Sequence, residues 1–112
     1  MSGKLAAYER RQKPRAPVPA MATVFRAEAR VGLFAIDNLS AGGALLAGEG
    51  ALNVGESLRV LLQLQGHLPI SIHAQVLRRD ERGGGAVAYG LTFRDLSARA
   101  EDLLQGAVLS AL

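Results

Sequence analysis

The sequence predicts an all-β domain, a small antiparallel barrel or sandwich, followed by a C-terminal helix. Short segments with period-two alternation recur along residues 21–93, turn-forming residues separate them, and the apolar period becomes helical after Ser97. A chain of 112 residues is one domain by length. Because only 4% of the residues are aromatic, the core must consist of Leu, Val, Ile and Ala.

The first half of the chain is expected to supply three strands. The first covers residues 21–30, with Thr23, Phe25, Ala27 and Ala29 on one face and Val24, Arg26, Glu28 and Arg30 on the other. Gly32 permits a bend or bulge before a second strand over residues 33–36. Residues 37–43 are typical of a turn, and residues 44–47 resume an apolar strand.

The second half is expected to supply three more strands and the helix. Alternation recurs over residues 58–64, 70–77 and 87–93, with a polar hairpin loop over residues 78–85. Ser97 is the expected N-cap of the helix, because its hydroxyl can accept a hydrogen bond from an early backbone N–H. The apolar face of this helix comprises Ala100, Leu103, Leu104, Ala107, Val108, Ala111 and Leu112.

The charge distribution divides the chain into a basic arm and a nearly neutral body. Residues 1–15 carry five basic and one acidic side chain, a net +4, whereas the remaining eight basic and nine acidic side chains give −1. We therefore expect residues 1–20 to form a flexible N-terminal arm and residues 21–112 to form the folded domain. A neutral body argues against a broad nucleic-acid-binding face, so no nucleic acid is expected as a partner.

Composition also excludes several chemistries. The chain has no cysteine, so it has neither disulfides nor a thiolate metal site, and its two histidines have no acidic cluster beside them. No segment approaches ~20 uninterrupted apolar residues, so no membrane span and a cytoplasmic location are expected. No serine has an identifiable base, which predicts that the protein is not an enzyme and needs no metal or cofactor.

Two polar segments are candidates for ligand binding. Arg10, Arg11 and Arg15 offer planar donor pairs that match phosphate oxygens and the O6/N7 edge of guanine. In the turn, Asn38 and Ser40 can hydrogen-bond to a ligand, and the Gly42–Gly43 pair permits close backbone approach. Each segment alone is more typical of a solvated tail or an ordinary loop.

Together, however, the two segments resemble the PilZ domain family of bacterial receptors for cyclic di-GMP. That family combines Arg-x-x-x-Arg in an N-terminal loop with Asp/Asn-x-Ser-x-x-Gly on the early strands of a small barrel. Residues 11–15 match the first motif and residues 38–43 the second, in the same order. The resemblance covers nearly the whole chain and implies a six-stranded antiparallel β-barrel with a C-terminal helix.

The resemblance also implies site residues. Arg11 and Arg15 would bind the guanine edge and the phosphates, while Asn38, Ser40 and the Gly43 backbone would hold the other side of the ligand. Arg10 would be compatible with a stacked pair of ligands. Asn38 takes the place of the commoner Asp, so the carboxylate that could accept from a guanine N–H is absent there.

The function that follows is a single-domain cyclic di-GMP receptor. Its arm would become ordered on ligand binding and signal through an unidentified effector protein, and the receptor could form a homodimer. The main alternative is a PilZ-like adaptor that does not bind cyclic di-GMP and acts by protein–protein contacts. A third reading is a small nucleic-acid-binding barrel, which is weakened by the small number of aromatic side chains available for base stacking.

Overall fold

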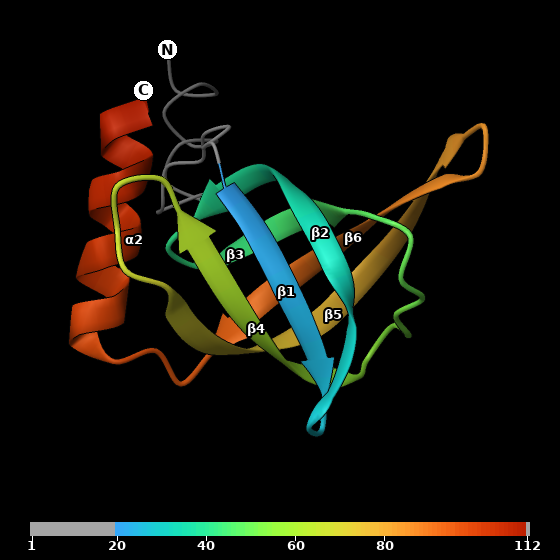
Figure 1. Ribbon diagram of the computed structural model, residues 1–112, viewed down its shortest axis with the longest axis horizontal. Helices are drawn as coiled ribbons and strands as arrows, with labels where there is room; N and C mark the ends of the chain where they lie inside the picture. Colours follow the sequence, from blue (N-terminus) through green and yellow to red (C-terminus); the bar gives the residue numbers. More distant parts are fainter. Residues whose placement is uncertain (1–19, 112) are drawn as a thin grey trace, which may run out of the picture.

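Six antiparallel strands close into one barrel in the order β1-β2-β3-β6-β5-β4 in the computed structural model, which describes residues 20–111 (Figure 1). The elements are β1 (Ala20–Arg26), β2 (Ala29–Ser40), β3 (Gly43–Ala47), β4 (Ser57–Leu64), β5 (Ile70–Gly83), β6 (Ala86–Arg94) and helix α2 (Ala98–Ala111). The predicted all-β class, strand number and C-terminal helix are confirmed.

Closure depends on β1, which pairs with β2 on one side and with β4 on the other. The barrel therefore has no unpaired sheet edge. Its core is mainly aliphatic, but the prediction of a core of Leu, Val, Ile and Ala alone is wrong, because Phe34, Tyr89 and Phe93 are also buried in it. The sequence pattern left open whether the strands form a barrel or a sandwich. The barrel closes because β1 pairs with β4. This pairing joins residues about 40 positions apart in the chain, such as Ala22 and Leu62.

The prediction of one strand over residues 21–30 is wrong. The chain turns at Ala27 and Glu28, where Ala27 has a φ of 55°. The buried side chains of β1 are Ala22 and Val24. Alternation continues through this hairpin without Gly, Asn or Pro at the turn, so the sequence carries no turn signal there. Phe25 remains outside the barrel, where the guanidinium of Arg59 lies 4.1 Å from the centre of its ring.

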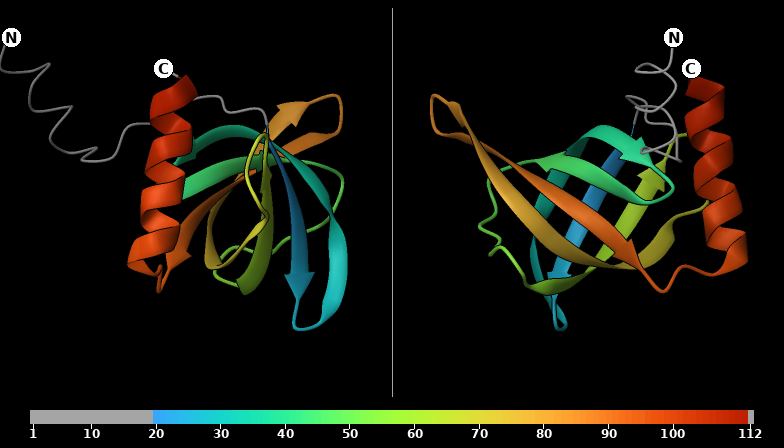
Figure 2. Two further views of the ribbon diagram at one scale, coloured as in Figure 1. Left: turned by 60° about the vertical axis from the view of Figure 1, so that its left-hand side comes forward. Right: turned by 180° about the vertical axis from the view of Figure 1, so that it is seen from behind.

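Two strands are longer than predicted. β2 runs through Gly32, with a bulge at Val31 where its register with β1 shifts, as the glycine suggested, and the predicted turn at residues 37–43 shrinks to Ala41 and Gly42. The predicted loop at residues 78–85 is mostly a two-stranded ribbon that projects beyond the barrel, with its turn at Gly84 and Gly85 (Figure 2). Both faces of a projecting ribbon are exposed to solvent. Its residues therefore lack the alternation of apolar and polar side chains that marks a half-buried strand.

Helix α2 begins as predicted and packs beside β2 (Figure 2). The backbone N–H of Ala100 donates to Oγ of Ser97 at 3.1 Å, which confirms the N-cap. Leu104, Ala107 and Val108 are buried on the apolar face. Ala111, expected on that face, is exposed, and Leu112 lies outside the described residues.

An ion pair ties the loop before β4 to the end of β1. Arg26 donates from Nε to Oε2 of Glu56 at 2.6 Å and from Nη2 to Oε1 at 2.7 Å, and Glu56 also accepts from the N–H of Asn53. The hydrogen bond from Arg26 is the main cause that lowers the pKa of Glu56. The pair therefore stabilises the fold above the ordinary carboxyl pKa, and this is lost as pH falls through the lowered value.

Leu104→Ala is expected to reduce the free energy of unfolding by about 3 kcal/mol, because it opens a cavity between α2 and the barrel at a fully buried position. Urea denaturation followed by circular dichroism measures this loss. Leu109→Ala on the same helix is the matched control. Its side chain is 58% exposed, so a change of about 0.5 kcal/mol or less is expected. Equal losses in the two variants would mean that α2 is not packed as described.

Candidate functional site

Cross-strand pairing gathers the second predicted motif on the outer surface of β2, β3, β6 and β5. One row of directly opposed residues consists of Asn38, Leu45, Gly90 and Arg78, and a second row consists of Ser40, Gly43, Thr92 and Gln75. The row between them, Leu39, Ala44, Leu91 and Val76, is buried. Because side chains alternate across a strand, the first two rows lie on the side of the sheet away from the barrel interior, although Ser40 and Gly43 there are covered from solvent. We call these eight residues the motif wall.

Asn38 is the least satisfied member of the motif wall. Its Oδ1 is shielded from solvent and has no hydrogen-bond partner within the part of the chain that the structure describes. An unpaired buried acceptor costs roughly 1–3 kcal/mol. A donor that reached this oxygen would remove that cost.

Asp37 is set apart from Asn38 by an irregularity in the pairing of β2. The register with β3 shifts between Ile36 and Asn38, so Asp37 has no cross-strand partner on that side. Its Oδ2 lies 3.7 Å from Nη1 of Arg82 on the projecting ribbon. Asp37 is thus held by an ion pair and does not replace Asn38 in the wall.

Ser40 has a structural role in the tight turn between β2 and β3. Its Oγ accepts from the N–H of Gly42 at 3.1 Å and from the N–H of Gly43 at 3.2 Å, and its hydroxyl donates to the Gly43 carbonyl at 3.4 Å. The side chain is buried. Ser40 therefore shapes the turn regardless of any ligand, and its predicted ligand contact stays a prediction.

Gly43 is required by the approach of β3 to β6. A Cβ at this position would lie 2.2 Å from the carbonyl oxygen of Leu91, which is backbone and cannot move aside. The Gly42 carbonyl accepts from the N–H of Phe93 at 2.9 Å, so the turn is bound to β6. The glycine of this motif is explained by packing alone, and its contact with a ligand also remains a prediction.

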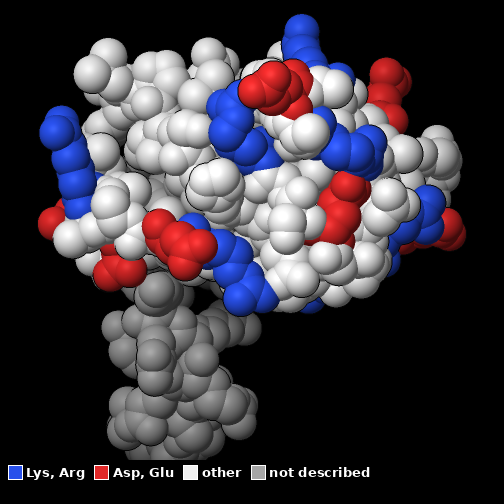
Figure 3. All heavy atoms as spheres, turned by 90° about the horizontal axis from the view of Figure 1, so that it is seen from below, with Lys and Arg blue, Asp and Glu red and all other residues white. Residues whose placement is uncertain are grey.

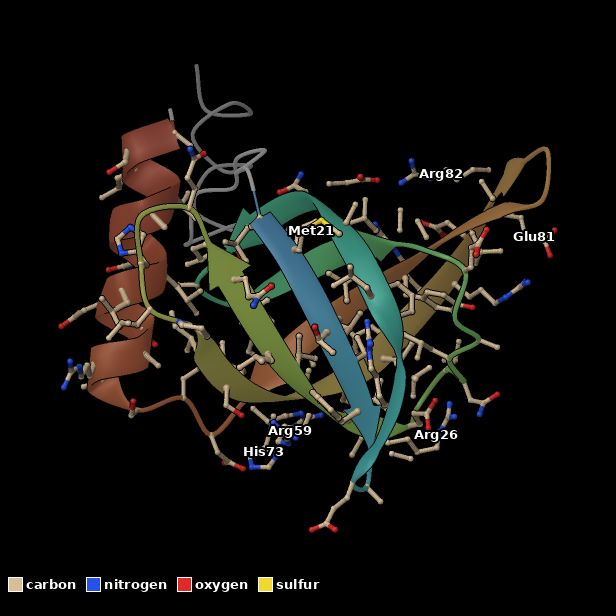
Figure 4. All side chains as sticks on the ribbon, in the orientation of Figure 1. Met21, Arg26, Arg59, His73, Glu81 and Arg82 are labelled. Carbon is tan, nitrogen blue, oxygen red and sulfur yellow. The ribbon has the colours of Figure 1, made fainter. Side chains whose placement is uncertain are left out.

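Arg10, Arg11 and Arg15 lie outside the described residues, but the register shows where their segment joins the barrel. Met21 pairs with Ala35, so β1 begins level with Ile36 of β2. Residues 37–40 of β2 extend past that point. The arm therefore joins the barrel beside the end of β2 that carries Asn38, close to the position of Met21 in Figure 4.

Arg78 is a member of the motif wall that sequence reasoning missed, because it was assigned to a solvated hairpin tip. Its side chain lies across Gly90, with Cγ 3.0 Å and Nε 3.1 Å from where a Cβ of Gly90 would be. Its Nε also lies 3.2 Å from Oδ2 of Asp80. The available signal was Gly90, since a glycine inside a strand often marks a close approach.

Other kinds of site find no support in the described part of the chain. Residues 20–111 contain no group of three or more His, Asp or Glu side chains that could hold a metal ion. Among those same residues, no helix has the length and apolar character needed to cross a membrane. The motif wall, with one unpaired amide oxygen and one arginine, is suited to bind a polar ligand noncovalently.

Comparison with known families identifies the chain. The family model of the PilZ domain matches residues 9–110. The chain therefore belongs to the PilZ domain family, which confirms the resemblance drawn from residues 11–15 and 38–43. A comparison with curated protein sequences found no match.

Solved structures agree with this fold. The PilZ domain with c-di-GMP of YcgR from Escherichia coli has a TM-score of 0.77 and 21% identity, covering 91% of each chain. The Bacillus subtilis inhibitor of motility MotI/DgrA has a TM-score of 0.73 and 24% identity, covering 90% of this chain and 50% of its own. The MrkH–c-di-GMP complex from K. pneumonia has a TM-score of 0.76 and 18% identity, covering 90% and 52%. The chain thus spans about half the length of the last two.

Proposed function

We propose that this chain is a non-enzymatic receptor for cyclic di-GMP. The observation that carries the proposal is the unpaired Oδ1 of Asn38, on the motif wall beside the point where the arginine-bearing arm joins the barrel. Membership of the PilZ family supports it, as do similar folds whose structures contain c-di-GMP. A cyclic dinucleotide carries two phosphates and two guanine faces, which arginines can pair with and stack upon.

In this proposal the ligand lies between the arm and the motif wall. Arg11 and Arg15 bind the guanine edge and the phosphates, and Arg10 is compatible with a stacked pair of ligands. Asn38 accepts a hydrogen bond from the side of the barrel, while Ser40 and Gly43 act mainly by keeping the turn in shape.

The proposed output is ordering of the arm. Residues 1–20 form the responsive arm and residues 21–112 the rigid domain, and the ordered arm changes contact with an effector protein. Binding takes place in the cytoplasm, and a homodimer is one form that the receptor could take. Amide hydrogen exchange of residues 1–20 with and without ligand tests this step, and equal protection in both states contradicts it.

A PilZ-like adaptor without ligand is the second candidate function. One observation favours it: Ser40 and Gly43 are fully explained by the turn and by packing against Leu91. The motif can therefore persist without a ligand. Isothermal titration calorimetry with cyclic di-GMP separates the two candidates. Saturable heat supports the receptor, and no heat at high ligand concentration supports the adaptor.

Arg78→Ala is expected to weaken cyclic di-GMP binding about tenfold, because it removes a charge-assisted hydrogen bond or a stacking surface from the motif wall. Gly90→Ala is expected to weaken binding several-fold with every charge retained, since its Cβ displaces the Arg78 side chain. Calorimetry measures both affinities.

Arg79→Ala is the matched control for this pair. Arg79 is the next residue on β5, but its guanidinium is bound to Oε1 of Glu81 at 2.7 Å and it is not in the motif wall. Its loss should leave the affinity unchanged. If Arg78→Ala behaves like Arg79→Ala, Arg78 takes no part in ligand binding.

A further inference from the structure

A second basic surface lies on the outer face of β4, β5 and β6. Arg59 is directly opposite His73, and His73 is directly opposite Arg94. Figure 4 shows Arg59 and His73 together near the start of β4. The residues that precede or follow them, Leu58, Ala74 and Phe93, are buried, so the three basic side chains project outward. We call Arg59, His73 and Arg94 the basic row.

In the described part of the chain, neither guanidinium of the basic row forms an ion pair with a carboxylate within 4 Å. Four of the described arginines, Arg26, Arg78, Arg79 and Arg82, have a carboxylate within 4 Å, whereas Arg30, Arg59, Arg94 and Arg99 do not.

Neutral groups hold both guanidiniums in place. Arg59 lies over the ring of Phe25 and donates to Oγ of Ser71 at 3.4 Å. Arg94 donates to Oε1 of Gln75. These partners orient the guanidiniums without neutralising their charge, as in a preorganised anion site.

The basic row borders a hollow of about 610 Å³. Ser57 and Gln75 also line it and add a hydroxyl and an amide. Asp95 is its one acidic lining residue, and its φ of 53° is in the left-handed region. With two arginines and one aspartate, the hollow is net positive.

We propose that this hollow binds a compact oxyanion, namely a phosphate group, either free or as the monoester of a small molecule. Guanidinium pairs and a hydroxyl match phosphate oxygens in charge and in donor geometry. Figure 3, which views this end of the barrel, shows basic side chains interspersed with acidic ones and no continuous basic field. That pattern fits a small anion and not a long polyanion.

The hollow is separate from the motif wall but adjoins it. Gln75 belongs to both surfaces. It pairs with Thr92 of the motif wall on β6 and with Ser57, which lines the hollow, on β4. The remaining members of the two surfaces differ. The experiment must therefore distinguish the hollow from the site of the proposed nucleotide receptor.

Titration of the ¹⁵N-labelled full chain with inorganic phosphate, at ionic strength held constant with sodium chloride, tests the proposal by NMR. Saturable shifts are expected for the amide signals of Ser57, His73, Gln75 and Arg94. A parallel titration with glycerol phosphate identifies the source of the group. Tighter binding of the monoester assigns a phosphorylated small molecule, and tighter binding of inorganic phosphate assigns the free ion.

Arg59→Gln and Arg94→Gln are each expected to weaken phosphate binding at least about tenfold, because each removes a charge-assisted donor. Asp95→Asn should tighten binding several-fold, since it removes the opposing charge and Asn tolerates a positive φ. Arg30→Gln is the control, because Arg30 is an exposed arginine of β2 that does not line the hollow. Thermal unfolding confirms that each variant is folded.

Two results would overturn the proposal. The first is a set of shifts that do not saturate, or that persist unchanged in Arg59→Gln and Arg94→Gln, which indicates ionic screening only. The second is loss of the phosphate shifts in an Arg11→Ala/Arg15→Ala variant, which places the phosphate in the arm. Shifts that survive in that variant support the hollow whether or not the chain binds cyclic di-GMP.

Discussion

Arg11→Ala and Arg15→Ala are each expected to weaken cyclic di-GMP binding by at least about a hundredfold. Each arginine would supply a bidentate, charge-assisted pair to guanine or phosphate, and each hydrogen bond to a charged group is worth roughly 1.5–3 kcal/mol. The motif wall contributes only the unpaired Oδ1 of Asn38 and the guanidinium of Arg78. These two groups cannot bind two phosphates without the arm. Calorimetry at constant salt measures the loss.

Arg30→Ala is the appropriate control for the arm variants. Arg30 pairs with Phe25, at the opposite end of β1 from the point where the arm joins the barrel. Arg82→Ala is less suitable, because Arg82 is ion-paired with Asp37 beside the motif. An unchanged affinity in Arg11→Ala and Arg15→Ala would refute the proposed role of the arm.

Gly43→Ala is expected to reduce the free energy of unfolding by about 3 kcal/mol or more. The new Cβ would lie 2.2 Å from the Leu91 carbonyl oxygen, so β3 and β6 would have to separate where the β2–β3 turn is bound. Urea denaturation measures the effect. A stability equal to that of the unsubstituted protein would mean that the two strands are not this close.

Gly106→Ala provides a control of opposite sign. It lies in α2, with open space around the position of a new Cβ. Alanine is favoured over glycine in a helix interior by about 1 kcal/mol, so this variant should be more stable. The comparison shows that the loss at Gly43 comes from the close approach of backbone and not from glycine replacement in general.

Gly43 and Ser40 of the motif act on the fold before they act on a ligand. Loss of ligand binding in Gly43→Ala would follow from the damaged turn even without any contact between Gly43 and the ligand. The arm arginines and Asn38 are therefore the residues whose substitution tests recognition. Ser40 accepts hydrogen bonds from two backbone N–H groups of the turn, so its substitution, like that of Gly43, would damage the fold as well as any ligand contact.

Local pattern was sufficient for several features. Alternation over residues 58–64 predicted β4, and Ser97 followed by a helical apolar period predicted the cap and buried face of α2. The pair of motifs indicated the family that the comparison confirms. These features depend on residues close together in the chain, where side-chain period and capping chemistry act directly.

Local sequence pattern did not predict the features that depend on pairing between residues distant in the chain. The turn at Ala27 and Glu28 contains none of the residues that usually form turns. The solvent-exposed ribbon of β5 and β6 has no alternation of apolar and polar residues. Arg78 reached the motif wall only through its pairing with Gly90. Arg59, His73 and Arg94 form a row only because three strands share one register.

By itself, then, the sequence determined the class of fold, its six strands and helix, and the two polar segments that identify the family. Tertiary structure decided which strands pair to close the barrel and which face of β1 is buried. It also decided which residues lie beside Asn38 and that Arg59, His73 and Arg94 form a row. The physical reason is that a strand's neighbours are set by register across the sheet, and a shift of one residue would turn each of these side chains to the other face.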